Sequence, residues 1–139
     1  MKPVAAVAML LVLMPVLAVS TPAALAQESL RKVDRQGPVT VSATLLVPPA
    51  AGIPIKVRVA LDTHSVDLDG VAFESNVALR RPDGSEVAAT VEQVTGSGHH
   101  RTAVLAFPAP GDVAQIRVVV KNVGGIAERI FTWEIGAGR

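Results

Sequence analysis

Apolar and polar residues alternate along most of the chain after residue 38. A two-residue period of this kind is typical of β-strands with one buried face. Over residues 55–63, the odd positions up to Leu61 are apolar, whereas the even positions carry lysine, arginine, alanine and aspartate. Seven such runs are predicted as strands, at residues 39–47, 55–63, 76–81, 86–94, 101–107, 114–121 and 127–135.

Turn residues separate these runs, and no segment after residue 26 shows the period of a helix. Pro82-Asp83-Gly84-Ser85, for example, is a type I turn signal between two predicted strands. Many short strands at this spacing predict an all-β fold, an antiparallel immunoglobulin-like or fibronectin III-like sandwich of about seven strands. The chain has no cysteine, so the sandwich would lack a disulfide. Its largest core occupant is expected to be Trp133 or Phe131.

The domain organisation follows from the composition of the first 38 residues. Lys2 precedes a long apolar run that ends in Ala24-Leu25-Ala26, which is the pattern of a secretory signal peptide over residues 1–26. An uncleaved anchor is the alternative, but Pro15 interrupts the apolar run. Polar residues 27–38 predict a flexible N-terminal arm, and residues 39–136 the sandwich domain. The expected location is periplasmic or extracellular, after cleavage behind Ala26.

Charge and cysteine content exclude several classes of function. Lys2 is the one charged residue of the leader, so residues 27–139 carry twelve basic and twelve acidic side chains. This balance indicates no nucleic-acid partner, and we expect no stable membrane insertion of the mature chain. The absence of cysteine excludes iron–sulfur clusters, thiolate metal sites and lipoprotein anchors. A metal site would have to use nitrogen and oxygen ligands.

Polar loops of unusual composition are expected to share one end of the sandwich. Successive antiparallel strands alternate in direction, so alternate connections fall at the same end. By this rule, the connections at residues 62–75, 95–100 and 122–125 lie together. They hold all three histidines of the chain. Loops at one end of a rigid sandwich are where this architecture usually carries a site.

The first functional hypothesis is a metal site in these loops. Asp62 and His64 are two residues apart on an extended segment, so their side chains would project to the same face. His99 or His100 could approach from the neighbouring loop. Imidazole and carboxylate ligands suit Zn(II) or Cu(II), with Asp67 or Asp69 orienting a ligating histidine. No motif of fixed spacing such as HExxH is present.

The alternative is a purely structural cluster. Aspartate and threonine side chains stabilise turns, and carboxylates commonly hold a histidine beside them. Arg101 and Arg129 could pair with Asp62, Asp67 or Glu128 and lock the loops together. A hydrolase triad of Asp62, His64 and a serine, Ser65 or Ser97, is disfavoured because the chain lacks a nucleophile elbow. A sandwich of this size also offers little concave volume for a substrate.

Three segments carry a resemblance to known sequences. "LDTHSVDLDG", "GSGHHR" and "VGGIAERIFTWEI" resemble, in this order, a group of small exported prokaryotic proteins that have no assigned activity. The resemblance covers about residues 55 to 135. This chain has Gly-Ser-Gly before its histidine pair where the group often has Gly-Gly. The matching positions are Asp62, His64, Asp67, His99, His100, Arg101, Glu128, Arg129 and Trp133.

Two functions therefore remain open at the level of sequence. One is an exported, non-enzymatic β-sandwich that binds Zn(II) or Cu(II) through the His/Asp cluster. The other is a structural or interaction module of the cell envelope, whose cluster is an internal network of hydrogen bonds and salt bridges. The expected partner is accordingly a metal ion or an envelope protein. Sugar binding is disfavoured by the absence of tyrosine.

Overall fold

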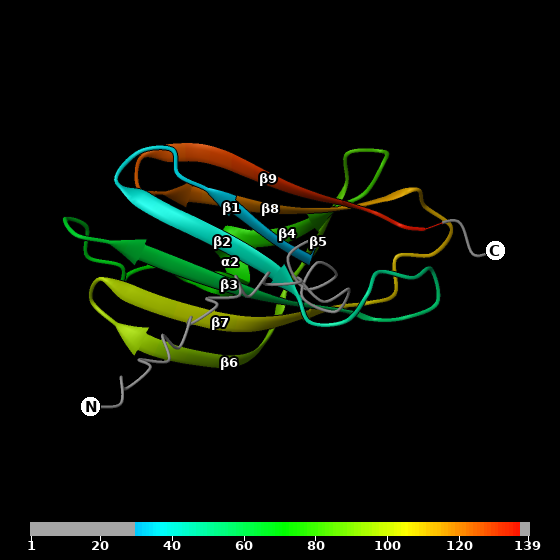
Figure 1. Cartoon of the computed structure of the whole chain (residues 1–139), viewed down its shortest axis with the longest axis horizontal. Helices are drawn as coiled ribbons and strands as arrows, with labels where there is room; N and C mark the ends of the chain where they lie inside the picture. The colour runs from blue at the N-terminus through cyan, green and yellow to red at the C-terminus, as the bar shows by residue number, and fades with distance from the viewer. Residues whose placement is uncertain (1–29, 137–139) are drawn as a thin grey trace, which may run out of the picture.

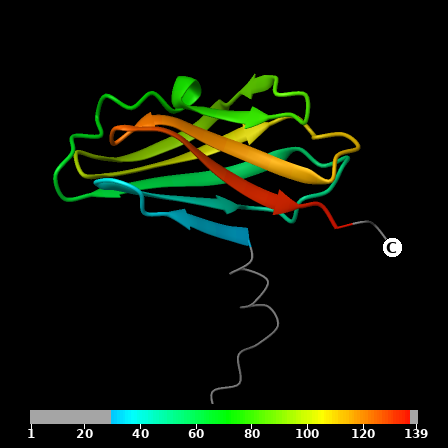
Figure 2. The ribbon, with the colours of Figure 1, turned by 90° about the horizontal axis from the view of Figure 1, so that it is seen from above.

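The computed structural model describes residues 30–136, which form two antiparallel β-sheets packed face to face (Figures 1 and 2). The five-stranded sheet has the order β1-β2-β3-β7-β6, and the four-stranded sheet has the order β5-β4-β8-β9. The order β2-β3-β7-β6 opposite β4-β8-β9 is that of immunoglobulin-like sandwiches, which confirms the predicted fold class. The elements are β1 (Arg31–Asp34), β2 (Val39–Leu45), β3 (Ile55–Thr63), α2 (Phe73–Asn76), β4 (Val77–Arg80), β5 (Glu86–Ala88), β6 (Thr90–Ser97), β7 (His100–Phe107), β8 (Gln115–Val123) and β9 (Ile126–Glu134).

One predicted strand is divided between the two sheets. Residues 86–94 were expected as a single strand, but β5 pairs with β4 in the four-stranded sheet, and β6 pairs with β7 in the other. The chain changes sheets at Ala89, whose side chain is buried. The first piece is therefore the edge strand of the four-stranded sheet, and the second is the edge strand of the five-stranded sheet. Alternation of apolar residues does not reveal such a change, because both pieces have the same period.

A second difference lies in the segment predicted as a flexible arm. Its residues Arg31–Asp34 form β1, which pairs with β2 at the edge of the five-stranded sheet. Contacts with the last strand hold β1 there. The Trp133 indole donates a hydrogen bond to the carbonyl of Leu30, and Arg129 forms an ion pair with Asp34. The predicted signal peptide and residues 27–29 lie outside the described residues.

The core follows the predicted alternation closely. In β3 the four inward side chains, from Ile55 to Leu61, are at most 3% exposed, whereas Lys56 and Arg58 are exposed. Phe131 and Trp133 are both buried in the core, as expected. The crossover between the sheets, residues 64–76, contains no additional strand and ends in the single-turn helix α2. Phe73 of this helix is buried in the core.

The three polar connections do lie at one end of the sandwich, on the left of Figure 1. The amide of Thr63 donates to the carbonyl of His99, which joins the end of β3 to the β6–β7 hairpin. Arg129 donates to the carbonyls of Val39 and Val123, which joins the start of β2 to the β8–β9 turn. The expected grouping of loops is therefore confirmed. None of the helices within residues 30–136 is long and apolar enough to span a membrane.

Candidate functional site

The β6–β7 hairpin is held at its tip by the crossover loop, residues 64–72. The amide of Leu68 donates to the carbonyl of Gly98 at 2.9 Å, and the amide of Gly98 donates to Oδ1 of Asp69 at 2.7 Å. Gly98 has a positive φ of 64°, which suits glycine in a two-residue hairpin turn. We call this contact between the crossover loop and Gly98–His99 the clasp.

Arg101 of β7 binds the crossover loop next to the clasp through hydrogen bonds to its backbone. Its Nη1 donates to the carbonyl oxygens of Leu68 at 2.8 Å and Val71 at 2.7 Å, with a longer contact of 3.3 Å to that of Asp69. Its guanidinium carbon lies 5.2 Å from the ring centre of Phe73, within the range of a cation–π contact. The expectation that Arg101 pairs with a carboxylate is wrong: its acceptors are backbone carbonyls that the turning loop leaves without strand partners.

Asp62 and His100 form the one contact between predicted metal ligands. They are directly opposite each other on β3 and β7, and Oδ1 of Asp62 lies 2.8 Å from Nδ1 of His100. A carboxylate can only accept a hydrogen bond, so Nδ1 must carry the proton in this pair. Both side chains are more than half exposed, and the imidazole keeps Nε2 available for another contact.

His64 and His99 are also exposed but take no part in that pair. β3 ends at Thr63, whose hydroxyl accepts hydrogen bonds from the amides of Ser65 and Val66 and turns the chain. The strand alternation that would place His64 on the same face as Asp62 therefore stops one residue too early. Within residues 30–136, no three His, Asp or Glu side chains gather closely enough to hold one metal ion. The four predicted ligands share an end of the molecule but do not surround one point.

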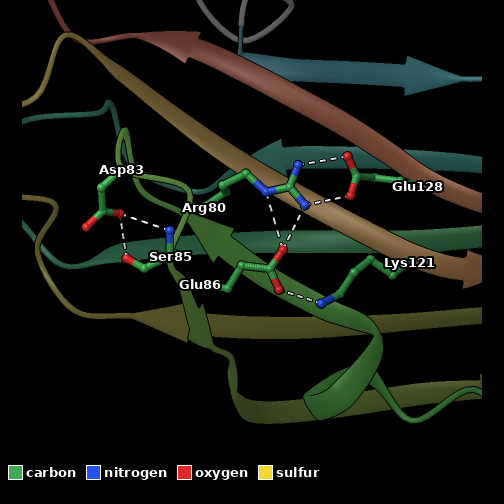
Figure 3. A network of polar contacts seen from close by, with 6 residues as sticks. All are labelled: Arg80, Asp83, Ser85, Glu86, Lys121 and Glu128. Atoms are coloured by element: carbon green, nitrogen blue, oxygen red, sulfur yellow. Dashed lines mark hydrogen bonds and ion pairs between the residues drawn. The ribbon is translucent and has the colours of Figure 1, made fainter.

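The other residues of the predicted network do not form one cluster but contact three different parts of the fold. Asp67 accepts a hydrogen bond from the amide of Asp69 and stabilises the crossover loop, as Asp69 does through Gly98. Glu128 lies elsewhere, on the outer face of the four-stranded sheet, where it pairs with Arg80 (Figure 3). The proposed pairing of Glu128 with Arg101 or Arg129 is therefore wrong. Since Arg129 faces the core, its neighbour on the strand must face solvent.

Arg80 and Glu128 belong to a network of charges that the sequence did not reveal (Figure 3). Glu86 binds both Arg80 and Lys121. The hydrogen bonds from Lys121 and Arg80 lower the pKa of Glu86, and the bond from Arg80 lowers the pKa of Glu128. The strand register sets Arg80 opposite Glu86 and Lys121 opposite Glu128. This register is fixed only when the strands pair, so the residue types alone did not indicate the network.

Arg129 is the largest fully buried side chain of the described residues, at 1% exposure. It donates to Oδ1 of Asp34 at 3.1 Å and to the carbonyl oxygens of Gln36, Val39 and Val123. Burial raises the pKa of Asp34, but hydrogen bonds from Gln36 and Arg129 outweigh it, so this pKa lies below its ordinary value of 3.8. Arg129 thus joins β9 to β1 and does not contact the His/Asp cluster.

Comparison with known proteins adds no assignment to this geometry. No family model, no curated protein and no solved structure matches the chain.

Proposed function

We propose that the chain is an exported, non-enzymatic β-sandwich that acts as an interaction module of the cell envelope. The observation that carries the proposal is the set of hydrogen bonds from Arg101 to the carbonyls of Leu68 and Val71. They fix a loop that would otherwise have few backbone partners. A surface that is ordered before binding loses less conformational entropy when a partner docks.

The side chains offered at this surface are polar and exposed. The imidazoles of His64 and His99 have no hydrogen-bond partner among the described residues, and the Asp62–His100 pair lies beside them. Because the amide of Thr63 donates to the carbonyl of His99 and the clasp holds the adjoining loop, these groups keep a fixed spacing. A protein partner with matching donors and acceptors is the occupant that this arrangement supports.

The proposal is tested by site-specific photo-crosslinking in the producing cell. A photoreactive residue in place of His99 should give one discrete adduct with another protein. The same residue in place of Asp112, which is exposed in the loop between β7 and β8 at the opposite end, should not. The His99 adduct should weaken when Arg101 is replaced by alanine. Equal labelling from both positions, or no adduct at His99, would contradict the proposal.

A second candidate function is binding of Zn(II) or Cu(II), with His100 as the central ligand. Metal-binding histidines commonly donate their other ring N–H to a carboxylate, and Asp62 occupies that position at 2.8 Å from Nδ1. His64 or His99 would supply a further ligand after rotation of its exposed side chain. Calorimetric titration of the protein with Zn(II) and Cu(II) tests this candidate. Equal affinity in a His64→Ala, His99→Ala, His100→Ala triple variant would eliminate it.

A further inference from the structure

The outer face of the five-stranded sheet carries a hollow of about 580 Å³. Successive cross-strand rows explain its shape. One row aligns Ser42 of β2 with Ala60 of β3, and both of these small side chains line the hollow. The hollow is lined by Leu30, Arg31, Ser42, Thr44, Leu45, Leu46, Arg58, Ala60 and Asp62.

The neighbouring row places two arginines along one side of this hollow. Arg31 on β1 lies opposite Thr44, and Thr44 lies opposite Arg58 on β3. Adjacent strands are about 4.8 Å apart, so the two arginine backbones stand about 10 Å apart with a hydroxyl between them. Guanidinium side chains from these positions can reach a common anionic group, and their planar donor sets match carboxylate or phosphate oxygens.

Neither of these arginine side chains has a hydrogen bond or ion pair with another described residue, whereas those of Arg101 and Arg129 donate to groups of the protein. Ser42 also lines the hollow, and no hydrogen bond joins its hydroxyl to another described residue. No buried side-chain nitrogen or oxygen of the described residues lacks a partner, so this hydroxyl must be accessible from the hollow. The hollow thus combines two arginine side chains that have no partner among the described residues with an accessible hydroxyl that can donate a hydrogen bond.

The other charged groups on this face leave the arginines available. Lys56 forms an ion pair with Glu92, and Asp62 accepts from His100. Asp62 is four residues from Arg58 along β3, about 13 Å away at the rise of a strand. Leu30 and Leu46 lie on the side of the arginine row that faces away from Asp62, and they add apolar surface to the hollow.

We propose that this hollow binds an amphiphilic anion, with its carboxylate or phosphate head between Arg31 and Arg58 and its alkyl tail against Leu30 and Leu46. The Thr44 and Ser42 hydroxyls donate hydrogen bonds to the head group. This site is separate from the clasp and does not depend on the proposed interaction with a partner protein.

Nuclear magnetic resonance titration of the purified protein tests the proposal with three probes: octanoate, octyl phosphate and inorganic phosphate. At least one octyl probe should bind saturably and shift the amide signals of Ser42, Thr44 and Arg58. Inorganic phosphate, which lacks the tail, should bind at least about tenfold more weakly. The stronger of the two octyl probes identifies the head group as carboxylate or phosphate.

An Arg31→Gln, Arg58→Gln double variant should lose at least about tenfold in affinity, since it removes two charge-assisted contacts from exposed positions. The matched control is Arg117→Gln, on the other sheet, which should bind as the unmodified protein does. Absence of saturable binding by both octyl probes would overturn the proposal. So would equal affinity of the double variant, or inorganic phosphate binding as tightly as the stronger octyl probe.

Discussion

Arg129 and Asp34 are 95 residues apart in the sequence, yet Nε of the arginine lies 3.1 Å from Oδ1 of the aspartate. The pair joins the first described strand to the last, and so joins the two sheets along one side of the sandwich. The arginine also donates to three backbone carbonyls in that region. The chain has no disulfide, and this contact supplies a comparable link between distant segments.

Replacing Arg129 by methionine should lower the free energy of unfolding by about 3–5 kcal/mol. The variant leaves Asp34 and three backbone carbonyls without their buried donor, and breaking one side of a buried ion pair costs this much. Urea denaturation at neutral pH measures the effect. Arg31→Met, on the exposed side of β1, is the control and should change stability by less than about 0.5 kcal/mol. Similar midpoints for both variants would contradict the role given to Arg129.

Stability should fall on acidification because the folded protein lowers the pKa of Asp34 and of Glu86. A carboxyl group whose folded-state pKa lies below its unfolded value stabilises the fold fully above the unfolded value. That contribution is lost as the pH falls through the folded-state pKa. The unfolded values are near 3.8 and 4.5, so the loss begins below about pH 5. Urea denaturation at several pH values in this range gives the free energy of unfolding as a function of pH. This free energy should depend less steeply on pH in Asp34→Asn than in the unmodified protein. An unchanged dependence would argue against the Arg129–Asp34 pair.

Replacing Arg101 by alanine should destabilise the protein by about 1–3 kcal/mol, because the carbonyls of Leu68 and Val71 lose a charged donor. The effect should be local as well as global. Amide hydrogen exchange should accelerate at Leu68 and Gly98, whose N–H groups form the clasp. Amides in the centre of β8 serve as the internal control and should lose protection only as far as global stability falls. Unchanged exchange at Leu68 would show that the arginine does not hold the loop.

The β8–β9 turn offers a matched pair of glycine substitutions. Gly124 and Gly125 both have positive φ, at 62° and 75°, so alanine is strained at either position. A Cβ at Gly124 would also lie 2.7 Å from Cγ2 of Val39, whereas a Cβ at Gly125 meets nothing within 4 Å. Gly124→Ala should therefore cost about 1–3 kcal/mol more than Gly125→Ala, the range expected for overpacking. Thermal unfolding of both variants checks this, and equal melting temperatures would contradict the close packing of the turn on β2.

Local alternation was sufficient to predict most strands, because one face of each is buried. It could not show that residues 86–94 divide at Ala89, since the period is the same in either sheet. Nor could it predict β1, whose residues Arg31–Asp34 do not carry a clear period. The partners that hold β1 are Trp133 and Arg129, about a hundred residues later, and their contacts exist only after the sheets have assembled.

The position of the loops was predictable for a topological reason. The chain passes from β5 to β6 without reversing direction, so the extra strand did not alter which connections share an end. The contacts of the charged residues were less accessible from sequence. Arg101 was expected to pair with a carboxylate, but the loop beside it turns so that backbone carbonyls point toward its guanidinium. A loop's backbone geometry has no simple signature in residue types.

Because hydrogen bonds within the protein hold the clasp, we expect it to be ordered, and to present the histidines, without a metal ion. Hydrogen exchange at the amides of Leu68 and Gly98, measured once with a chelator and once with excess Zn(II), distinguishes an intrinsically ordered clasp from a metal-organised one. We expect strong protection with the chelator and little change on adding Zn(II). Protection that appears only with Zn(II) would contradict this expectation and would favour a metal-organised site.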